Sequence, residues 1–200
     1  MRAIITLAVL ATLSLVAVVP VSLGYQLDLG LPRVHEQCNQ WSISFEWDGP
    51  EGYSRSVSHS TSEAGGIGGQ KTSTDTLTLV SSFGFSKIIK VVVTQYPSED
   101  PSLQDFASLS DKALKAASRS GGCRNTTCSA REIDGNLGAF VVGKSCKGDG
   151  EYYSSVYPLN LGLDKSKKVT TSNTLITFTS TFDRDTTETF LDTVHIDRSV

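Results

Sequence analysis

Apolar residues occur at every second position over much of this sequence. Between residues 41 and 47, large apolar side chains alternate with serine and glutamate, which is the pattern of a β-strand with one buried face. The same period, or a short apolar run bounded by turn residues, predicts further strands at 53–60, 74–81, 88–96, 129–133, 137–144, 151–159 and 174–182. The segment 88–96 is almost continuously apolar, so we expect it in the interior of a sheet.

One long segment has the spacing of a helix instead. It begins at Asp100-Pro101, with Ser102 facing Asp105 as a capping pair, and it ends before the glycine pair at 121–122. Apolar residues recur along one side, which predicts a helix that packs against a sheet. This stripe consists of Leu103, Phe106, Ala107, Ala113, Leu114 and Ala117.

A short helix is expected near the C-terminus, with Asp185 as its cap, Phe190, Leu191 and Val194 on its buried side, and His195 at its end. No strand–helix–strand rhythm repeats along the chain, which disfavours a doubly wound nucleotide-binding fold. We therefore predict an α+β fold. An antiparallel β-sheet of about seven to eight strands would carry one long and one short C-terminal helix, as an α/β sandwich.

The first residues have the layout of a secretory signal peptide. Arg2 precedes a run of 17 residues without a charge, and small residues precede the expected cleavage point after Gly24. An uncleaved membrane anchor is the alternative, because that run approaches the shortest length that crosses a bilayer as a helix. Either way, we expect the body of the chain to be secreted or at the cell surface. The expected organisation is a signal peptide at 1–24, a polar lead-in at 25–37 and a single secreted domain at 38–198.

All four cysteines follow this leader, and an even number in an oxidising compartment predicts two disulfides. Three pairings are possible. The shortest loop joins Cys123 to Cys128, and Cys38 would then join Cys146. A four-cysteine zinc site is the alternative, but such sites favour two closely spaced pairs and only one pair here is close in sequence. In the same loop, the triplet that begins at Asn125 is an acceptor for an N-linked glycan.

Charge and motif spacing disfavour several classes of function. The formal net charge is −3, and the short basic run at 165–168 is better explained as a solvated turn than as a nucleic-acid patch. Three segments, at 65–72, 143–148 and 183–187, nearly match phosphate-loop, nucleophile-elbow and phosphatase motifs and then fail in spacing or context.

The remaining candidates for chemistry are histidines and tyrosines. The histidines are scattered, so we predict no catalytic, cofactor-binding or metal-binding set, although a triad assembled from distant positions stays open; they are His35, His59 and His195. Three tyrosines are expected in the core or at its rim, with an exposed sugar-stacking platform as the alternative; they are Tyr152, Tyr153 and Tyr157.

Four features of the second half of the chain form one arrangement. They are a helix that ends before a strand, the turn at 133–136 that leads into the strand 138–142, the aromatic strand 152–157, and the ending 190–196. Over residues 102–196 this arrangement resembles the PsbP-like and DcrB-like α/β sandwich proteins, which are often exported. Members of that group are mostly accessory or binding proteins without a shared catalytic set, so the resemblance implies no functional residue.

We therefore expect a non-catalytic extracytoplasmic binding or accessory protein of PsbP-like type. Its partner would be an unidentified extracellular or envelope component, and the resemblance implies no cofactor. The alternative is a secreted hydrolase that acts on glycans or esters, with its residues dispersed in sequence. A membrane would be contacted only through the leader, if the leader is not cleaved.

Non-reducing peptide mapping of the exported protein tests the covalent framework. We expect Cys123 joined to Cys128 and a first peptide that begins at Tyr25, because export places the thiols in an oxidising compartment. Two free thiols at positions 123 and 128 would refute the pairing. A first peptide that still contains Arg2 would indicate an uncleaved anchor.

Overall fold

The computed structural model describes residues 31–49, 52–63, 71–82, 87–120, 122–145, 150–159 and 172–199. In chain order, its elements are β1 (Arg33–Cys38), β2 (Trp41–Glu46), β3 (Tyr53–Glu63), β4 (Lys71–Ser81), β5 (Ile88–Gln95), the 3-10 helix η1 (Pro101–Gln104), α2 (Phe106–Ser120), β6 (Gly122–Ile133), β7 (Asn136–Ser145), β8 (Glu151–Pro158), β9 (Thr174–Ser180), α3 (Arg184–Thr193) and β10 (His195–Arg198).

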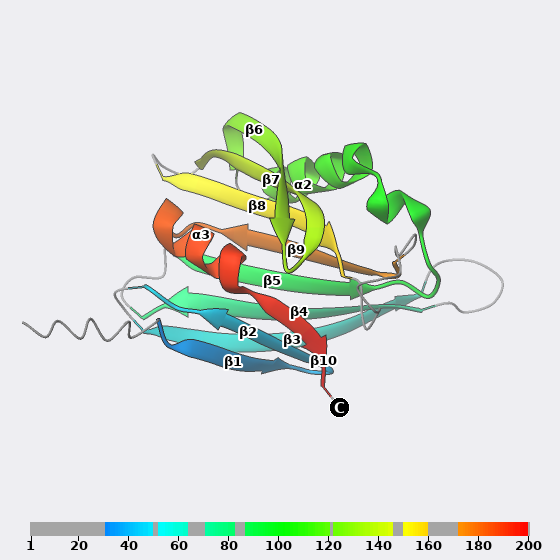
Figure 1. Ribbon diagram of the computed structural model, residues 1–200, viewed down its shortest axis with the longest axis horizontal. Helices are drawn as coiled ribbons and strands as arrows, with labels where there is room; N and C mark the ends of the chain where they lie inside the picture. Colours follow the sequence, from blue (N-terminus) through cyan, green and yellow to red (C-terminus); the bar gives the residue numbers. More distant parts are fainter. Residues whose placement is uncertain are drawn as a thin grey trace, which may run out of the picture. The chain divides into compact units, whose positions relative to one another are not determined.

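The strands form two antiparallel sheets (Figure 1). The larger sheet has seven strands in the order β3-β4-β5-β9-β8-β7-β6, and the smaller has three in the order β1-β2-β10. The chain is therefore mostly antiparallel β-sheet with helices packed on it, which confirms the predicted class at the coarse level. The apolar strand β5 lies in the interior of the larger sheet, as its composition predicts.

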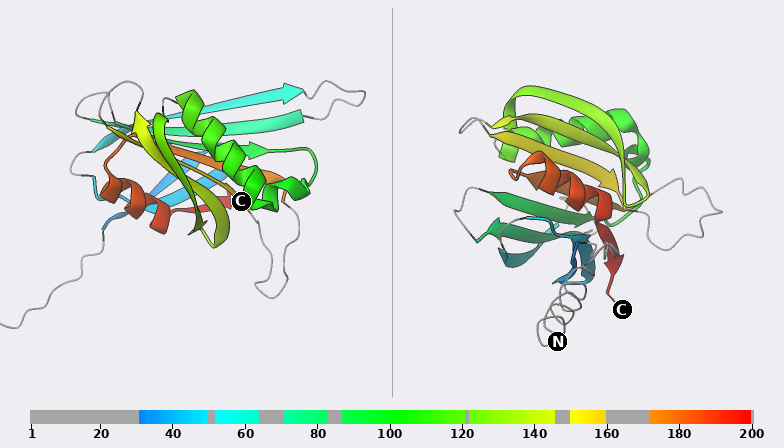
Figure 2. Two further views of the ribbon diagram at one scale, coloured as in Figure 1. Left: turned by 90° about the horizontal axis from the view of Figure 1, so that it is seen from above. Right: turned by 60° about the vertical axis from the view of Figure 1, so that its left-hand side comes forward.

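The helix α2 covers one face of the larger sheet, over β6 to β9, and α3 lies on the opposite face (Figure 2). Leu109, Ala113 and Ala117 recur at the spacing of one helix face and pack in a cluster with Val141 and Val156. Small alanine side chains allow the helix to approach the sheet closely. Within the described residues, neither α2 nor α3 has the length and apolar character that a bilayer crossing requires.

The other face of the larger sheet meets the smaller sheet and α3 in an aromatic layer. The ring centroid of Phe190 in α3 lies 4.5 Å from that of Phe45 in β2 and 5.3 Å from that of Phe178 in β9. Trp41 and Tyr157 are fully buried in the same cluster. Burial of each such side chain contributes about 1.5–3 kcal/mol, so this layer holds the smaller sheet and α3 in place.

The smaller sheet differs from the sequence prediction. Its first strand, β1, begins at Arg33, inside the segment predicted as a polar lead-in. Its third strand, β10, follows α3 directly, so His195 begins a strand and does not end a helix. The prediction failed in β1 because Glu36, a charged residue, occupies an inward position between Val34 and Cys38, and the apolar alternation is broken there.

The helices also differ in detail from the prediction. The segment expected as one helix from Asp100 is divided, because η1 ends at Asp105 and α2 begins after it. The Asp100 carboxylate accepts the N–H of Ser102, and Asp105 accepts an N–H of the first turn of α2, so each piece has its own cap. Phe106 and Leu114, expected on the buried stripe, are exposed.

At the start of α3 the capping residue is Asp183, not Asp185. The Asp183 carboxylate accepts the N–H of Thr186 at 3.0 Å, which is the usual bond between a capping residue and the third helical residue. The segment 183–187 is thus a strand end followed by a capped helix, which is the structural interpretation that the sequence favoured over a phosphatase motif.

Gly138 in β7 is needed where β7 crosses close to β8. A Cβ atom on Gly138 would lie 2.7 Å from Tyr157 Cβ and 2.9 Å from the Val156 carbonyl oxygen. We expect Gly138→Ala to lower the free energy of unfolding by about 1–3 kcal/mol, because backbone atoms of β8 must move. Gly150→Ala is the matched control, since a Cβ there meets nothing within 4 Å. Urea denaturation of both variants measures the difference, and equal stability would contradict the close approach.

Candidate functional site

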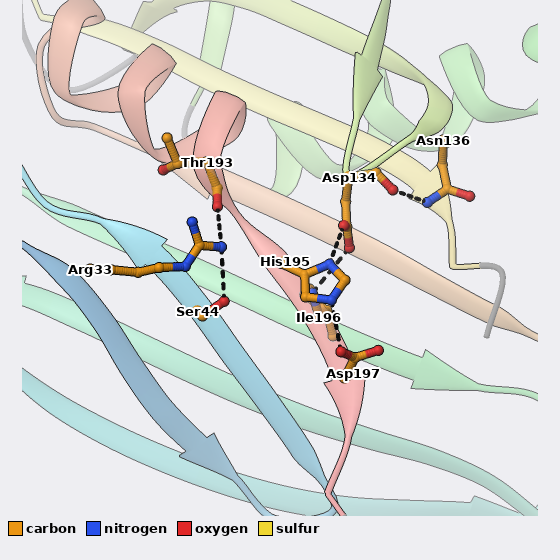
Figure 3. A network of polar contacts seen from close by, with 8 residues as sticks. All are labelled: Arg33, Ser44, Asp134, Asn136, Thr193, His195, Ile196 and Asp197. Atoms are coloured by element: carbon orange, nitrogen blue, oxygen red, sulfur yellow. Dashed lines mark hydrogen bonds and ion pairs between the residues drawn. The ribbon is translucent and has the colours of Figure 1, made fainter. Parts of the chain in front are cut away.

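Three segments that are distant in sequence come together in one place (Figure 3). They are the start of β1, the β6–β7 turn and the junction of α3 with β10. Together they line an open hollow of about 520 Å³. The polar side chains of its lining are Arg33, Glu132, Asp134, Asp192, Thr193 and His195.

The imidazole of His195 lies between two carboxylates. Its Nδ1 is 2.7 Å from Asp134 Oδ1, and its Nε2 is 2.7 Å from Asp197 Oδ2. The second oxygen of Asp134 accepts the backbone N–H of Ile196 at 3.0 Å. Because Asp134 belongs to the larger sheet while His195 and Ile196 belong to β10, this cluster ties the two sheets together.

The β6–β7 turn directs the Asp134 carboxylate toward β10. Asp134 and Gly135 have φ angles of 52° and 70°, as a two-residue hairpin turn of the primed type requires. Aspartate followed by glycine is a favoured pair there, because both residues tolerate a positive φ. The side-chain amide of Asn136 donates to the Asp134 carbonyl at 2.7 Å and closes the turn.

The cluster changes the protonation of its members. The hydrogen bond to Asp134 and the charges of both carboxylates raise the pKa of His195, since they favour the imidazolium form. Burial raises the pKa of Asp134 and outweighs the hydrogen bonds that it accepts from His195 and Ile196. The imidazolium of His195 therefore persists to higher pH than that of an isolated histidine.

Arg33 closes the other side of the hollow. Its guanidinium donates to Ser44 Oγ and to the carbonyl oxygen of Thr193, both at 3.2 Å. Thr193 is the last residue of α3, where unpaired carbonyls carry partial negative charge. The Thr193 hydroxyl also accepts the backbone N–H of Glu46 at 2.9 Å, so the end of α3 is joined to both β1 and β2.

Hydrogen-bonding partners surround the polar side chains of the hollow. A general base needs a ring nitrogen within reach of the group that it deprotonates, and both nitrogens of His195 contact carboxylates. Ser44 is the cross-strand partner of His195, and its Oγ accepts a hydrogen bond from the Arg33 guanidinium at 3.2 Å. Over the described ranges, three or more histidine, cysteine or acidic side chains do not gather in a way that could hold a metal ion.

A second polar cluster surrounds Asp75 of β4, whose carboxylate is buried. It accepts Trp41 Nε1–H at 3.1 Å and Asn39 Nδ2–H at 3.0 Å, and it lies 2.7 Å from His59 Nδ1. Burial, together with the charge of Asp75, raises the pKa of the Cys38 thiol to about 11, so Cys38 as a free thiol is uncharged at neutral pH. The cluster joins β3 and β4 to the β1–β2 turn.

A second open hollow, of about 460 Å³, lies between the β6–β7 hairpin and α3. The Arg131 guanidinium lies 5.0 Å from the centroid of the Phe140 ring and forms an ion pair of 2.6 Å with Asp192. Glu188 pairs with Arg184 at 2.8 Å and lies 3.9 Å from Arg131. Both arginines of this hollow thus have carboxylate partners from α3.

The structure places the predicted tyrosines in the core. Tyr152, Tyr153 and Tyr157 are all buried, which confirms the packing interpretation and makes the sugar-stacking platform wrong. The three histidines do not come together: His35 is exposed on β1, while His59 and His195 belong to the two separate clusters.

Most residues of the predicted disulfides and glycan lie outside the part of the chain that the structure describes. The side chains of Cys123 and Asn125, and residue Cys146, lie outside the described residues, so both disulfides and the glycan stay predictions. The backbone from Cys123 to Cys128 is part of β6 and not a separate loop, with register shifts on either side of Arg124. Because a disulfide needs Cα atoms within about 7 Å, a bond between these residues requires β6 to bend at those irregularities.

Sequence reasoning missed Asp75 and Asp134 as cluster centres. Asp75 occupies an inward position of β4, in register with Leu77 and Leu79, and a charge at an apolar position is the signal that could have revealed it. Asp134 was recognised only as a turn residue. Its partners in β10 lie about sixty residues further along the chain, and no local pattern indicates such a contact.

Comparison with protein-family models finds no match to this chain. Comparisons with curated proteins and with solved structures likewise find no match. The fold and the candidate site are therefore defined by the contacts of this chain's own residues.

The pH dependence of stability tests the His195 cluster. Because the folded-state pKa of His195 is raised, its contribution is fully present below about pH 6.5, the unfolded value, and is lost as pH rises through the folded pKa. We expect His195→Gln to lower the free energy of unfolding by at most about 1 kcal/mol below about pH 6.5, since the imidazole is half exposed. The loss should be smaller at a pH above the folded-state pKa of His195.

Urea denaturation of wild type and His195→Gln between about pH 5.5 and 8.5 measures this difference. His35→Gln is the matched control, because His35 is an exposed histidine outside the cluster. A difference that does not change with pH would contradict the ion-pair assignment.

Proposed function

We propose that this chain is a non-catalytic extracytoplasmic binding or accessory protein. The observation that carries the proposal is the pairing of the charged groups in the two open hollows described above. The titratable side chains at their centres contact one another, and both nitrogens of His195 are engaged by carboxylates. Such surfaces present fixed charges and hydrogen-bonding groups to a polar partner, without an activated nucleophile.

We further propose that the fold is an α/β sandwich of the PsbP-like type. The proposal is supported by the long helix α2 on one face of the larger sheet, by the β6–β7 hairpin and by α3 close to the C-terminus. The proposal concerns the larger sheet with α2 and α3, and the smaller sheet β1-β2-β10 lies beside it.

Export belongs to the same proposal. A signal peptide cleaved after Gly24, two disulfides and a glycan on Asn125 would suit a protein that works outside the cytoplasm. The acceptor triplet lies on β6, an edge strand of the larger sheet, where the backbone is not enclosed between two neighbouring strands. The partner would be an extracellular or envelope component.

A secreted hydrolase is the second candidate, and one observation favours it. A buried aspartate that holds an exposed histidine is the orienting half of a catalytic triad, and Asp134 and His195 have this relation. The nucleophile would have to approach His195 by displacing Asp197 from Nε2.

Activity measurements separate the two candidates. We expect the secreted protein to hydrolyse neither chromogenic esters nor glycosides at a rate that depends on His195. The assay compares wild type with His195→Gln, and His35→Gln serves as the control for loss of an exposed histidine. Turnover that His195→Gln reduces more than about a hundredfold, while His35→Gln retains it, would establish the hydrolase.

A further inference from the structure

The strand β3 forms one free edge of the larger sheet. It runs for 11 residues and pairs with β4 over its whole length without a register shift. From Ser54 to Glu63 every residue of the strand is exposed. No other described segment pairs with its outer side, because β3 stands at the end of the strand order.

The hydrogen-bond pattern shows which backbone groups point outward. The N–H of Ser82 donates to the carbonyl of Gly52 at 2.9 Å, which makes Gly52 and Ser82 a hydrogen-bonded pair. In an antiparallel ladder such pairs recur at every second residue, so the even-numbered residues of β3 bond to β4. The odd-numbered residues therefore direct their N–H and C=O groups away from the sheet, from Tyr53 to Glu63.

Several of the usual protections of a sheet edge are absent from β3, and those present are the side chains of Arg55 and His59, which point to carboxylates of their own chain. The strand β3 contains no proline and no lysine, and its ladder with β4 has no bulge. The other edge strand, β6, has two register shifts against β7, which bend the strand and interrupt its edge. β6 is regular only from Thr127 to Ile133, so β3 offers the longer uninterrupted edge for the addition of a strand.

We propose that a second copy of this chain adds to β3, antiparallel, about a two-fold axis at His59. This arrangement joins the larger sheets of two molecules into one continuous sheet through β3–β3 pairing. The hydrogen-bonded pairs would be Arg55 with Glu63 of the partner subunit, Val57 with Thr61 of the partner subunit, and His59 with its own copy.

Charge complementarity within β3 favours a second copy as the occupant. Arg55 and Glu63 lie at equal distances on either side of His59, so the two-fold axis places opposite charges across the interface twice. Each also has a partner of opposite charge in its own chain, Arg55 with Glu36 at 2.5 Å and Glu63 with Lys71 at 3.5 Å, so the proposed pairs would join these ion pairs into one network of alternating charge. The His59 imidazole, which would lie at the axis, contacts the Asp75 carboxylate of its own chain at 2.7 Å.

The opposite face of β3 is also self-complementary. It carries only serines, at positions 54, 56, 58, 60 and 62. In the proposed register, Ser58 lies opposite Ser60 of the partner subunit, and Ser56 lies opposite Ser62 of the partner subunit. Small hydroxyl side chains can pair across strands and leave no steric obstacle to the approach of a second chain.

The test measures the mass of the purified protein in solution by sedimentation over a range of concentrations. We expect wild type to approach twice the monomer mass as the concentration rises. Val57→Pro should weaken dimerisation by about tenfold or more, because proline removes an outward N–H at two symmetric places. The β3–β4 ladder is retained, since the Val57 N–H does not point to β4.

Val57→Thr is the matched control, because it changes the same side chain and keeps the N–H. It should dimerise as wild type does. Circular dichroism and thermal unfolding establish that both variants fold. A wild type that stays monomeric at all concentrations, or a folded Val57→Pro that dimerises like Val57→Thr, would overturn the proposal.

Cross-linking tests the register. In the double variant Ser58→Cys/Ser60→Cys, the thiol at position 58 of each chain faces the thiol at position 60 of the other chain. This is a pair without mutual hydrogen bonds, and the Cα atoms of such a pair lie about 4.5 Å apart, close enough for a disulfide. We expect mild oxidation to give a covalent dimer. Peptide mapping should find a disulfide between position 58 of one chain and position 60 of the other. Ser58→Cys alone should not cross-link. A dimer linked through Ser58→Cys alone would move the axis to residue 58 and overturn the proposed register.

Discussion

The aromatic layer between the two sheets is the contact on which the other features of this protein depend. Phe45, Phe178 and Phe190 come from the smaller sheet, the larger sheet and α3, and their rings pack together. Apolar burial is not directional, so it brings these elements together without setting their exact register. Loss of this layer would release the smaller sheet and, with it, every polar contact between the sheets.

Polar clusters around the layer set how the sheets align. Asp75 accepts bonds from the β1–β2 turn, and Asp134 accepts bonds from β10. A buried carboxylate without partners is costly, so each cluster penalises any packing in which its donors are displaced. These aspartates and His195 therefore contribute to the alignment of the two sheets, with His195 held between the carboxylates of Asp134 and Asp197.

The same construction leaves two kinds of surface for function. The open hollows at the ends of β6, β7 and α3 present polar side chains, most of whose charges are paired, and these are the surfaces of the proposed binding function. The edge of β3 presents unpaired backbone groups and few side-chain obstacles, which suits the addition of a strand. Binding at these surfaces needs no rearrangement of the core, because both lie outside the aromatic layer.

Local pattern predicted a strand at each of β2 to β9 and a helical segment before Gly121, because alternation, turn chemistry and capping act between near neighbours. It did not predict the first half of β6, which was expected to be a loop, or the division of the helical segment into η1 and α2. It failed for β1 and β10, whose short strands are defined by pairing with β2, and it could not place His195 beside Asp134. Such contacts join residues about sixty positions apart, and their existence depends on how apolar faces stack in three dimensions, which no short stretch of residues encodes.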